Sequence, residues 1–200
     1  MPRSLSDADI ESFRERLIDA AERLFATHGP EAVTMRQLAA ELGVSPMTPY
    51  RYFKDKDAIL AATRARAFNR HAEALETAYE KTTGDIAARS TAAGRAYIRF
   101  AFDHPEAYKL MFDIAQPSEA DYPELVAAAQ RSRATLTRYA GDLVATGAAK
   151  GDPELIGQTY WAALHGPIML QFSGKLTPGY DATMLIAALT RALRRADFGE

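Results

Sequence analysis

The chain has 200 residues, which is enough for one or two small domains with a substantial buried core. Its 24 lysines and arginines against 26 aspartates and glutamates give a formal net charge of -2. No overall basic charge therefore attracts nucleic acid, and any such site has to be a local patch. The lack of cysteine excludes disulfides, thiolate metal sites and a cysteine nucleophile.

No targeting or membrane-spanning segment is expected. The N-terminal stretch MPRSLSDADIESFRER lacks the apolar region of a secretory signal, and no run of about 18 apolar residues occurs. The histidines show no paired spacing that predicts a metal site, and no cofactor motif is present. We therefore expect a cytoplasmic protein without metal, cofactor or membrane association.

Apolar residues recur at intervals of three and four along the whole chain, as is typical of helices. The strict alternation typical of strands is absent, so the sequence predicts an all-α protein of about nine helices. The first helix is expected from Asp7 to His28, where Gly29 and Pro30 end it.

A second helix is expected from Thr34 to Leu42. Thr34 is a favourable N-cap residue, and Gln37 lies three residues further on, as a capping box requires. Val33 and Leu38 occupy the positions whose apolar side chains pack against each other across a helix start.

A third, shorter helix is expected after a turn. Gly43 supplies the left-handed backbone of that turn, and Ser45 is expected to cap the helix with Pro46 at its first position. Pro49 then occupies a fourth helical position, where proline removes a backbone donor. A later helix start, or a start as a tight turn, reduces this cost.

The remaining helices follow from caps and from a repeated dipeptide. Pro-Glu opens three of them, because proline suits the first helical position and glutamate meets the positive end of the helix dipole. The expected helices run from Asp55 to about Lys81, from Thr83 or Gly84 to Asp103, from starts near His104, Tyr122 and Asp152, and over roughly residues 179–196.

The segment TMRQLAAELGVSPMTPYRYFKDKDAIL has the spacing of a helix-turn-helix, in which the second helix enters the DNA major groove. Its outward groups include hydroxyl, aromatic and guanidinium groups, which suit phosphates and base edges, followed by lysines at the next helix start. These side chains belong to Thr48, Tyr50, Arg51, Tyr52, Lys54 and Lys56. The alternative is a plain hairpin of two helices.

Residues 34–60 resemble the DNA-binding domain of the tetracycline-repressor (TetR) family. The matching residues are Thr34, Leu38, Ala39, Leu42, Gly43, Val44, Ser45, Thr48, Tyr50, Tyr52, Phe53, Lys56 and Leu60. Pro49 departs from the family, which usually has leucine or another helix former there. The segments HPEAYKLMF and WAALHGP are similar to parts of the ligand-binding domains in one branch of the family, marked by Trp, His and Gly.

The resemblance implies a dimeric transcription regulator with a helix-turn-helix DNA-binding domain over residues 1–54 and a ligand-binding and dimerisation domain over 55–200. It implies a repressor that binds a palindromic operator in double-stranded DNA and is released by a small, largely apolar effector. By position, the resemblance assigns DNA contacts to Thr34, Arg36, Thr48, Tyr50, Tyr52 and Lys56, whereas Val44 and Phe53 belong to the core. The remaining DNA-binding candidates are Ser45, Met47, Arg51 and Lys54, of which Met47 is either an apolar contact or a filler.

The larger domain is rich in aromatic residues at helical spacing. They form either an apolar ligand pocket with a few polar groups or an ordinary core. The pocket candidates are Tyr97, Phe100, Tyr108, Met111, Phe112, Trp161, His165 and Met169. Trp161 and His165 share one helix face, and Gly166-Pro167 predicts a break or kink directly after them.

The last two helices have wide apolar faces with small residues. Such faces favour a homodimer that forms a four-helix bundle, and the alternative is that both helices are buried within one subunit. One face carries Leu155, Ile156, Thr159, Ala162, Ala163, Gly166 and Met169, and the other carries Leu185, Ile186, Ala188, Leu189, Ala192 and Leu193.

Two other functions remain open, a helical interaction module without a DNA role and a small enzyme. The sequence contains no catalytic motif, so we predict that the protein is not an enzyme.

Overall fold

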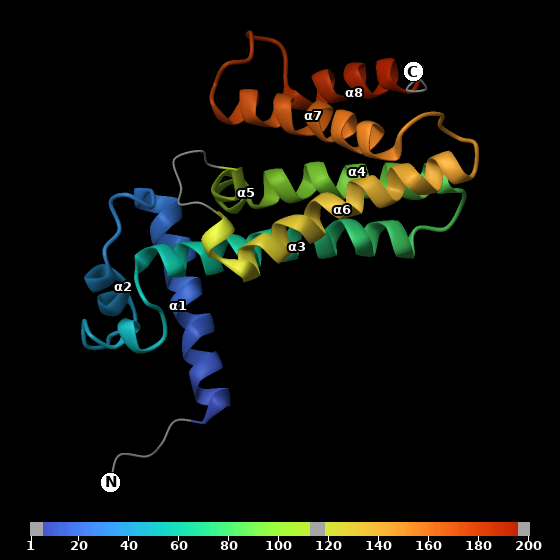
Figure 1. The fold of residues 1–200 in the computed structure, drawn as a ribbon. Coiled ribbons are helices and arrows are strands. Elements are labelled where there is room, and N and C mark those ends of the chain that lie inside the picture. Colours follow the sequence, from blue (N-terminus) through green and yellow to red (C-terminus); the bar gives the residue numbers. More distant parts are fainter. Residues whose placement is uncertain (1–5, 113–118, 196–200) are drawn as a thin grey trace. The chain divides into compact units, whose positions relative to one another are not determined.

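The computed structural model describes residues 6–112 and 119–195 (Figure 1). These residues form eight α-helices, two short 3₁₀-helices and no strand, so the predicted all-α fold is confirmed and the helix number is close to the expected nine. In chain order the elements are α1 (Asp7–His28), α2 (Met35–Glu41), η1 (Pro49–Arg51), α3 (Lys56–Lys81), α4 (Ile86–Asp103), α5 (Pro105–Phe112), η2 (Glu119–Asp121), α6 (Pro123–Ala145), α7 (Pro153–Phe172) and α8 (Ala182–Leu193).

The chain groups into two compact units. The first comprises residues 1–67 and 110–128, and the second comprises residues 68–109 and 129–200. Helices α3, α5 and α6 contribute residues to both units. The domain boundary expected between residues 54 and 55 stays a prediction. In the structure, the first turns of α3 group with the N-terminal helices. Within the described ranges, no helix is long and apolar enough to cross a membrane.

The helix starts are set by local hydrogen bonds. At α2, Gln37 N donates to Thr34 Oγ1 at 3.2 Å, and Thr34 N donates to Gln37 Oε1 at 2.8 Å, which confirms the capping box. At α3, Ala58 N donates to Asp55 Oδ1 at 2.8 Å. The Pro-Glu dipeptides open α5, α6 and α7 as predicted.

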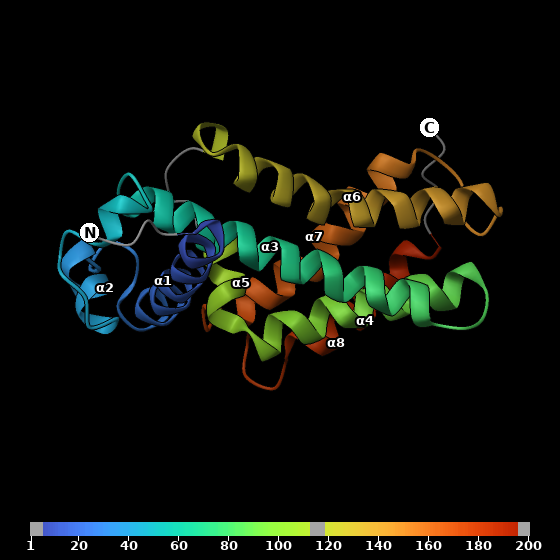
Figure 2. The same ribbon diagram turned by 90° about the horizontal axis from the view of Figure 1, so that it is seen from below.

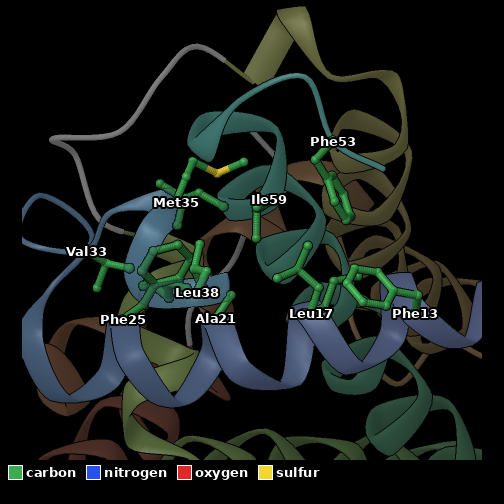
Figure 3. Packing of buried hydrophobic residues seen from close by; sticks show 12 residues of the cluster. Phe13, Leu17, Ala21, Phe25, Val33, Met35, Leu38, Phe53 and Ile59 are labelled. Carbon is green, nitrogen blue, oxygen red and sulfur yellow. The ribbon is translucent and has the colours of Figure 1, made fainter. Parts of the chain in front are cut away.

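One apolar cluster joins α1, α2 and the start of α3 in the first unit (Figure 3). Phe13, Leu17 and Phe25 project from one face of α1 towards Leu38 of α2 and Ile59 of α3. Burying a side chain of this size contributes about 1.5–3 kcal/mol relative to leaving it exposed. The cluster therefore fixes α1, α2 and α3 around the turn that follows α2.

Two arginines of α3 add polar contacts within the same unit. Arg66 pairs with Asp19 of α1 at 2.5 Å, and this contact lies partly in solvent. Arg64 is buried and donates from Nε to the Leu110 carbonyl and from Nη2 to the Met111 carbonyl, at 3.2 Å each. The guanidinium thus satisfies carbonyls at the C-terminal end of α5, which have no intrahelical donor.

In the second unit, α7 packs against α4 and α8 runs beside α7 (Figures 1 and 2). A close approach joins α7 to α6 at Gly157, where an added Cβ would lie 3.1 Å from the Thr137 Cα. Only glycine therefore fits at this position without moving a backbone.

Helix α7 continues through Pro167 to Phe172, so of the break or kink predicted after His165 the break does not occur, and the kink stays a prediction. Proline removes one backbone hydrogen bond from a helix interior. Pro167 and Ile168 are both buried, and this burial of apolar surface offsets the lost bond.

Candidate functional site

The segment between α2 and η1 forms a turn and not the predicted α-helix. Ser45 Oγ accepts from Met47 N at 3.3 Å, and the Ser45 carbonyl accepts from Thr48 N at 2.9 Å. Regular structure begins only at Pro49, the first residue of the 3₁₀-helix η1. The predicted helix start with Pro46 at the first position is therefore wrong.

Pro49 explains why the helix starts late. At the first position of a helix the missing N–H has no partner to lose, so proline is tolerated there. Its side chain is buried, and its carbonyl accepts from the backbone N of both Tyr52 and Phe53 at 3.0 Å. The departure from the family pattern is accommodated by a single 3₁₀ turn over Pro49–Arg51 in place of an α-helix.

This turn exposes side chains with varied chemistry. Met47 is 67% exposed and Tyr50 is 48% exposed, and the basic side chains of Arg51 and Lys54 also reach solvent. Thr48 is half-buried. The turn thus presents hydroxyl, aromatic, thioether and cationic groups that are close in the sequence. Such groups can contact both base edges and phosphates.

Tyr52 has a packing contact in addition to the DNA contact predicted for it. Its ring stacks on Phe13 of α1 with the ring centroids 4.2 Å apart, and its carbonyl accepts from Arg14 Nη1 at 2.9 Å. The Arg14 guanidinium also lies 4.3 Å from the centre of the Phe53 ring. These contacts attach the end of η1 to α1 and hold the exposed turn in place.

Three predicted phosphate-binding residues lie at helix starts of the same unit. The Thr34 hydroxyl donates to Gln37 within the capping box, and Arg36 is exposed on the first turn of α2. Lys56 Nζ donates to the Pro30 carbonyl at 2.8 Å, which ties the start of α3 to the loop after α1. An ammonium has three donors, so this bond leaves capacity for a phosphate.

Charge is locally positive in this segment. Residues 34–56 carry four cations, Arg36, Arg51, Lys54 and Lys56, and two carboxylates, whereas the whole chain has a net charge of -2. Both carboxylates are engaged: Glu41 pairs with Arg23 at 3.2 Å, and Asp55 caps α3. The segment is therefore a candidate for the local basic patch that DNA binding requires.

A second candidate site is a chain of hydrogen bonds in the second unit. The Trp161 indole N–H donates to the Tyr97 hydroxyl at 3.1 Å, and the hydroxyls of Tyr97 and Tyr108 lie 2.6 Å apart. The Tyr108 hydroxyl lies 2.8 Å from Nδ1 of His165. Three helices, α4, α5 and α7, thus bring four of the predicted pocket residues together.

The other predicted pocket residues take different places. Phe100 is buried on α4, one turn beyond Tyr97, whereas Met169 is half-buried on α7. Met111 and Phe112 group with the first unit, where the Met111 carbonyl accepts from Arg64.

His71 of α3 joins this site without having been singled out in the sequence. Its ring lies edge-to-face with Tyr97 at 4.8 Å and with Phe100 at 5.2 Å, and its Nδ1 lies 2.9 Å from Ser132 Oγ of α6. Nε2 is buried and has no hydrogen-bond partner among the described residues. The only sequence signal is that His71 falls on an apolar stripe of α3 with Phe68.

Burial keeps the titratable groups of this site uncharged. It lowers the pKa of His71 to about 3 and also lowers the pKa of His165. Burial raises the pKa of the Tyr97 and Tyr108 hydroxyls. Among the described residues the single buried Lys, Arg, Asp or Glu is Arg64, which belongs to the first unit.

No group of three or more metal-binding side chains occurs in residues 6–112 and 119–195. In the second unit, the hydrogen-bonded chain consists of two tyrosine hydroxyls, an indole N–H and a histidine ring.

Two family models match the sequence. The model described as bacterial regulatory proteins of the tetR family matches residues 17–63, and the model described as the tetracyclin repressor-like C-terminal domain matches residues 90–193.

Curated relatives are also regulators by name. An HTH-type transcriptional regulator of Mycobacterium tuberculosis is 25% identical over 149 residues, which are 72% of this chain and 61% of that protein. The HTH-type transcriptional regulator BetI of Brucella canis is 33% identical over 119 residues, which are 56% of this chain and 58% of that protein. The chain thus spans less than two thirds of the length of these relatives.

Solved structures resemble the chain over nearly its whole length. A protein of unknown function from Rhodococcus sp. RHA1 has a TM-score of 0.80 and 28% identity, and the match covers 99% of both chains. A TetR-family structure from Mesorhizobium loti has a TM-score of 0.69, covers 92% of this chain and 96% of that one, and shares the fold at 18% identity.

The C-terminal model alone matches more than half of the chain, and the N-terminal model covers the helix-turn-helix whose geometry is described above. The chain belongs to the TetR family of transcriptional regulators.

Proposed function

We propose that this regulator binds a palindromic operator as a homodimer, represses transcription, and releases the operator when a small effector occupies the second unit. The observation that supports DNA binding most directly is the exposed turn around η1, held between the buried faces of α1, α2 and α3. A DNA-binding role places the protein in the bacterial cytoplasm.

The contacts divide by chemistry. Base edges are met by the exposed residues of the turn, Met47, Thr48 and Tyr50, and phosphates are met by the cations and hydroxyls around them. The proposed phosphate-binding residues are Thr34, Arg36, Ser45, Arg51, Lys54 and Lys56, while Tyr52 combines packing on Phe13 with a contact from its hydroxyl.

Exposed apolar side chains on α7 and α8 support the homodimer. Leu155 and Leu170 of α7 are 47% and 42% exposed, and Met184 and Leu189 of α8 are 51% and 41% exposed. A concentration of exposed apolar residues indicates an interaction surface. Ile156 and Ala163, which the sequence assigned to the same apolar face of α7, are buried within the subunit.

Release of the operator follows from a population shift. Two recognition turns of a dimer have to lie about 34 Å apart to enter successive major grooves. An effector that binds more tightly to another separation lowers operator affinity by its differential affinity for the two states. Helix α3 contributes to both units and is the element through which we expect this coupling.

The test is selection of bound sequences from random duplexes at two salt concentrations. A repressor enriches a palindrome whose binding weakens steeply with salt. Enrichment of no sequence by a folded dimer would show that residues 34–60 form a structural hairpin.

A pair of matched variants tests the assigned face. Arg51→Ala removes a cation of the exposed turn, so operator affinity falls and the salt slope decreases by about 1. Arg133→Ala removes an exposed cation of α6 and leaves both unchanged. Equal effects of the two substitutions would contradict the assignment of the η1 turn to DNA.

A further inference from the structure

His71 carries the one histidine nitrogen that is buried without a hydrogen-bond partner among the described residues. The His71 side chain is 1% exposed, and its other nitrogen is occupied by Ser132 Oγ at 2.9 Å. Buried polar atoms in native proteins are almost always hydrogen-bonded, so an exception calls for a partner such as a water, an ion or a ligand. The hydroxyls of Ser90 and Tyr139 in the same unit are also buried without a hydrogen-bond partner among the described residues, but His71 is the one that contacts the ring of Tyr97.

The free nitrogen belongs to the same cluster as the chain of hydroxyls. The His71 ring contacts the Tyr97 ring at 4.8 Å, and the Tyr97 hydroxyl connects to Tyr108 and to Trp161. Trp161 and His165 are partly exposed, whereas His71, Tyr97 and Tyr108 are buried. The polar groups therefore lead from the surface of the second unit to its interior.

The surroundings disfavour a charged ligand at the depth of His71. No Lys, Arg, Asp or Glu of the described part of the second unit is buried, so a carboxylate, phosphate or ammonium in the interior would have no buried ionic partner. Half-buried cations such as Lys109, whose Nζ lies 5.5 Å from the centre of the Phe172 ring, lie nearer the solvent. An unpaired charge in a buried site is strongly unfavourable. The rings of Tyr97, Phe100 and Trp161 instead suit an apolar body.

Either tautomer of His71 can bind a hydroxyl. If Ser132 donates to Nδ1, then Nε2 carries the proton and donates to the ligand; if Nδ1 donates to Ser132, then Nε2 accepts from the ligand. A hydroxyl group both donates and accepts, so it is satisfied in either case.

We propose that the effector of this regulator is an uncharged alcohol or phenol with an apolar body, and that Nε2 of His71 binds its hydroxyl group. The inference rests on the proposed function, because it names the ligand class of the effector site. It assigns the polar recognition of the ligand to α3, the helix that continues into the first unit.

The single tryptophan of the chain makes the test direct, because Trp161 belongs to the site. The full chain, without DNA, is titrated with straight-chain 1-alkanols and with the carboxylates of equal chain length while Trp161 emission is recorded. Saturable changes with the alkanols, at affinities at least about tenfold above those of the carboxylates, are expected. Equal affinities, or no saturable change with any alkanol, overturn the proposal.

His71→Phe keeps the aromatic packing and removes the nitrogen, so alkanol affinity should fall about tenfold. His28→Ala, at the exposed end of α1, is the control. If the folded His71→Phe protein binds alkanols with wild-type affinity, the role of His71 is overturned. If that variant fails to fold, the comparison of alkanols with carboxylates in the unmodified chain still decides the ligand class.

The outcome is separable from that of the proposed function. Alkanol binding without any selected operator would remove the DNA role and leave the ligand class standing. A selected operator with no alkanol response would leave the regulator standing and remove this inference.

Discussion

Two histidine side chains of the second unit, His71 and His165, are kept neutral by burial. A protonated imidazole inside the unit would lack the water that solvates its charge, so burial lowers the pKa of both side chains. In the unfolded chain they titrate near the ordinary histidine pKa of about 6.5. Protonation therefore favours the unfolded state.

We predict that acid destabilises the protein through His71. Its folded pKa of about 3 lies below the unfolded value, so its stabilising contribution is fully present above about pH 6.5. The contribution is lost as pH falls towards 3, by about 1.4 kcal/mol per pH unit. Urea denaturation between pH 7 and pH 5 measures this slope.

The comparison that isolates His71 uses His71→Phe, in which the free energy of unfolding should fall less steeply with acid. His28→Ala, which removes an exposed histidine at the end of α1, is the control substitution. Identical slopes for wild type and His71→Phe would contradict the prediction.

His71 also shows why part of the site could not be predicted from sequence. Its partner Ser132 lies 61 residues away, and their contact depends on how α3 and α6 pack. Four residues of the site could be proposed from the sequence, because aromatic and polar side chains recur there at helical intervals. They are Tyr97, Tyr108, Trp161 and His165. No local pattern distinguishes a histidine with a free buried nitrogen from one in an ordinary core.

At the scale of helices, most boundaries were predictable because their causes are local. Each start signal acts within one turn of the helix that it begins. These signals are the capping box of Thr34 and Gln37, the cap of Asp55, and the Pro-Glu dipeptides. The predicted start of the third helix at Pro46 is wrong, because Pro49 takes the first position of the 3₁₀-helix η1. The burial of Pro49 and the stacking of Tyr52 on Phe13 of α1 depend on packing that no local pattern shows.

Helix packing depends on one glycine in the second unit. We predict that Gly157→Ala destabilises the protein by about 1–3 kcal/mol, because the new methyl group would lie 3.1 Å from the Thr137 backbone and force α7 away from α6. Urea denaturation measures the change in the free energy of unfolding.

Gly141→Ala is the matched control, since an added Cβ there meets nothing within 4 Å. It lies within α6 and should stabilise the protein by about 0.5–1 kcal/mol through helix propensity. A Gly157→Ala protein as stable as Gly141→Ala would show that α7 and α6 can separate without cost.

At the scale of the whole molecule, the proposed homodimer would let two η1 turns bind one operator together. We predict that Leu189→Asp, which places a charge on the exposed apolar face of α8, converts dimers to monomers and weakens operator binding. Sedimentation velocity measures the mass. Ile10→Asp, at an exposed apolar residue of α1, should leave the dimer intact; a dimeric Leu189→Asp protein would exclude this face.

Helix α5 contributes residues to both units. Tyr108 of α5 belongs to the hydroxyl chain, and the last carbonyls of α5, those of Leu110 and Met111, accept from Arg64 of α3. Arg64 lies two turns beyond Lys56 on α3. If an effector in the second unit moves Tyr108, we expect α5 to pass the change to Arg64 and so to α3, the helix that carries the proposed phosphate contact of Lys56.

We predict that Arg64→Met separates effector binding from release. The variant should bind alkanols with wild-type affinity in the Trp161 titration, because Arg64 belongs to the first unit and the titrated site to the second. It should require about tenfold more alkanol to release the operator, since the donor pair between α3 and α5 is gone.

Fluorescence anisotropy of a labelled operator measures release, with Arg133→Met as the control. Unchanged release by Arg64→Met would show that the effector signal does not pass through α5, and a loss of alkanol binding would show that Arg64 shapes the effector site itself.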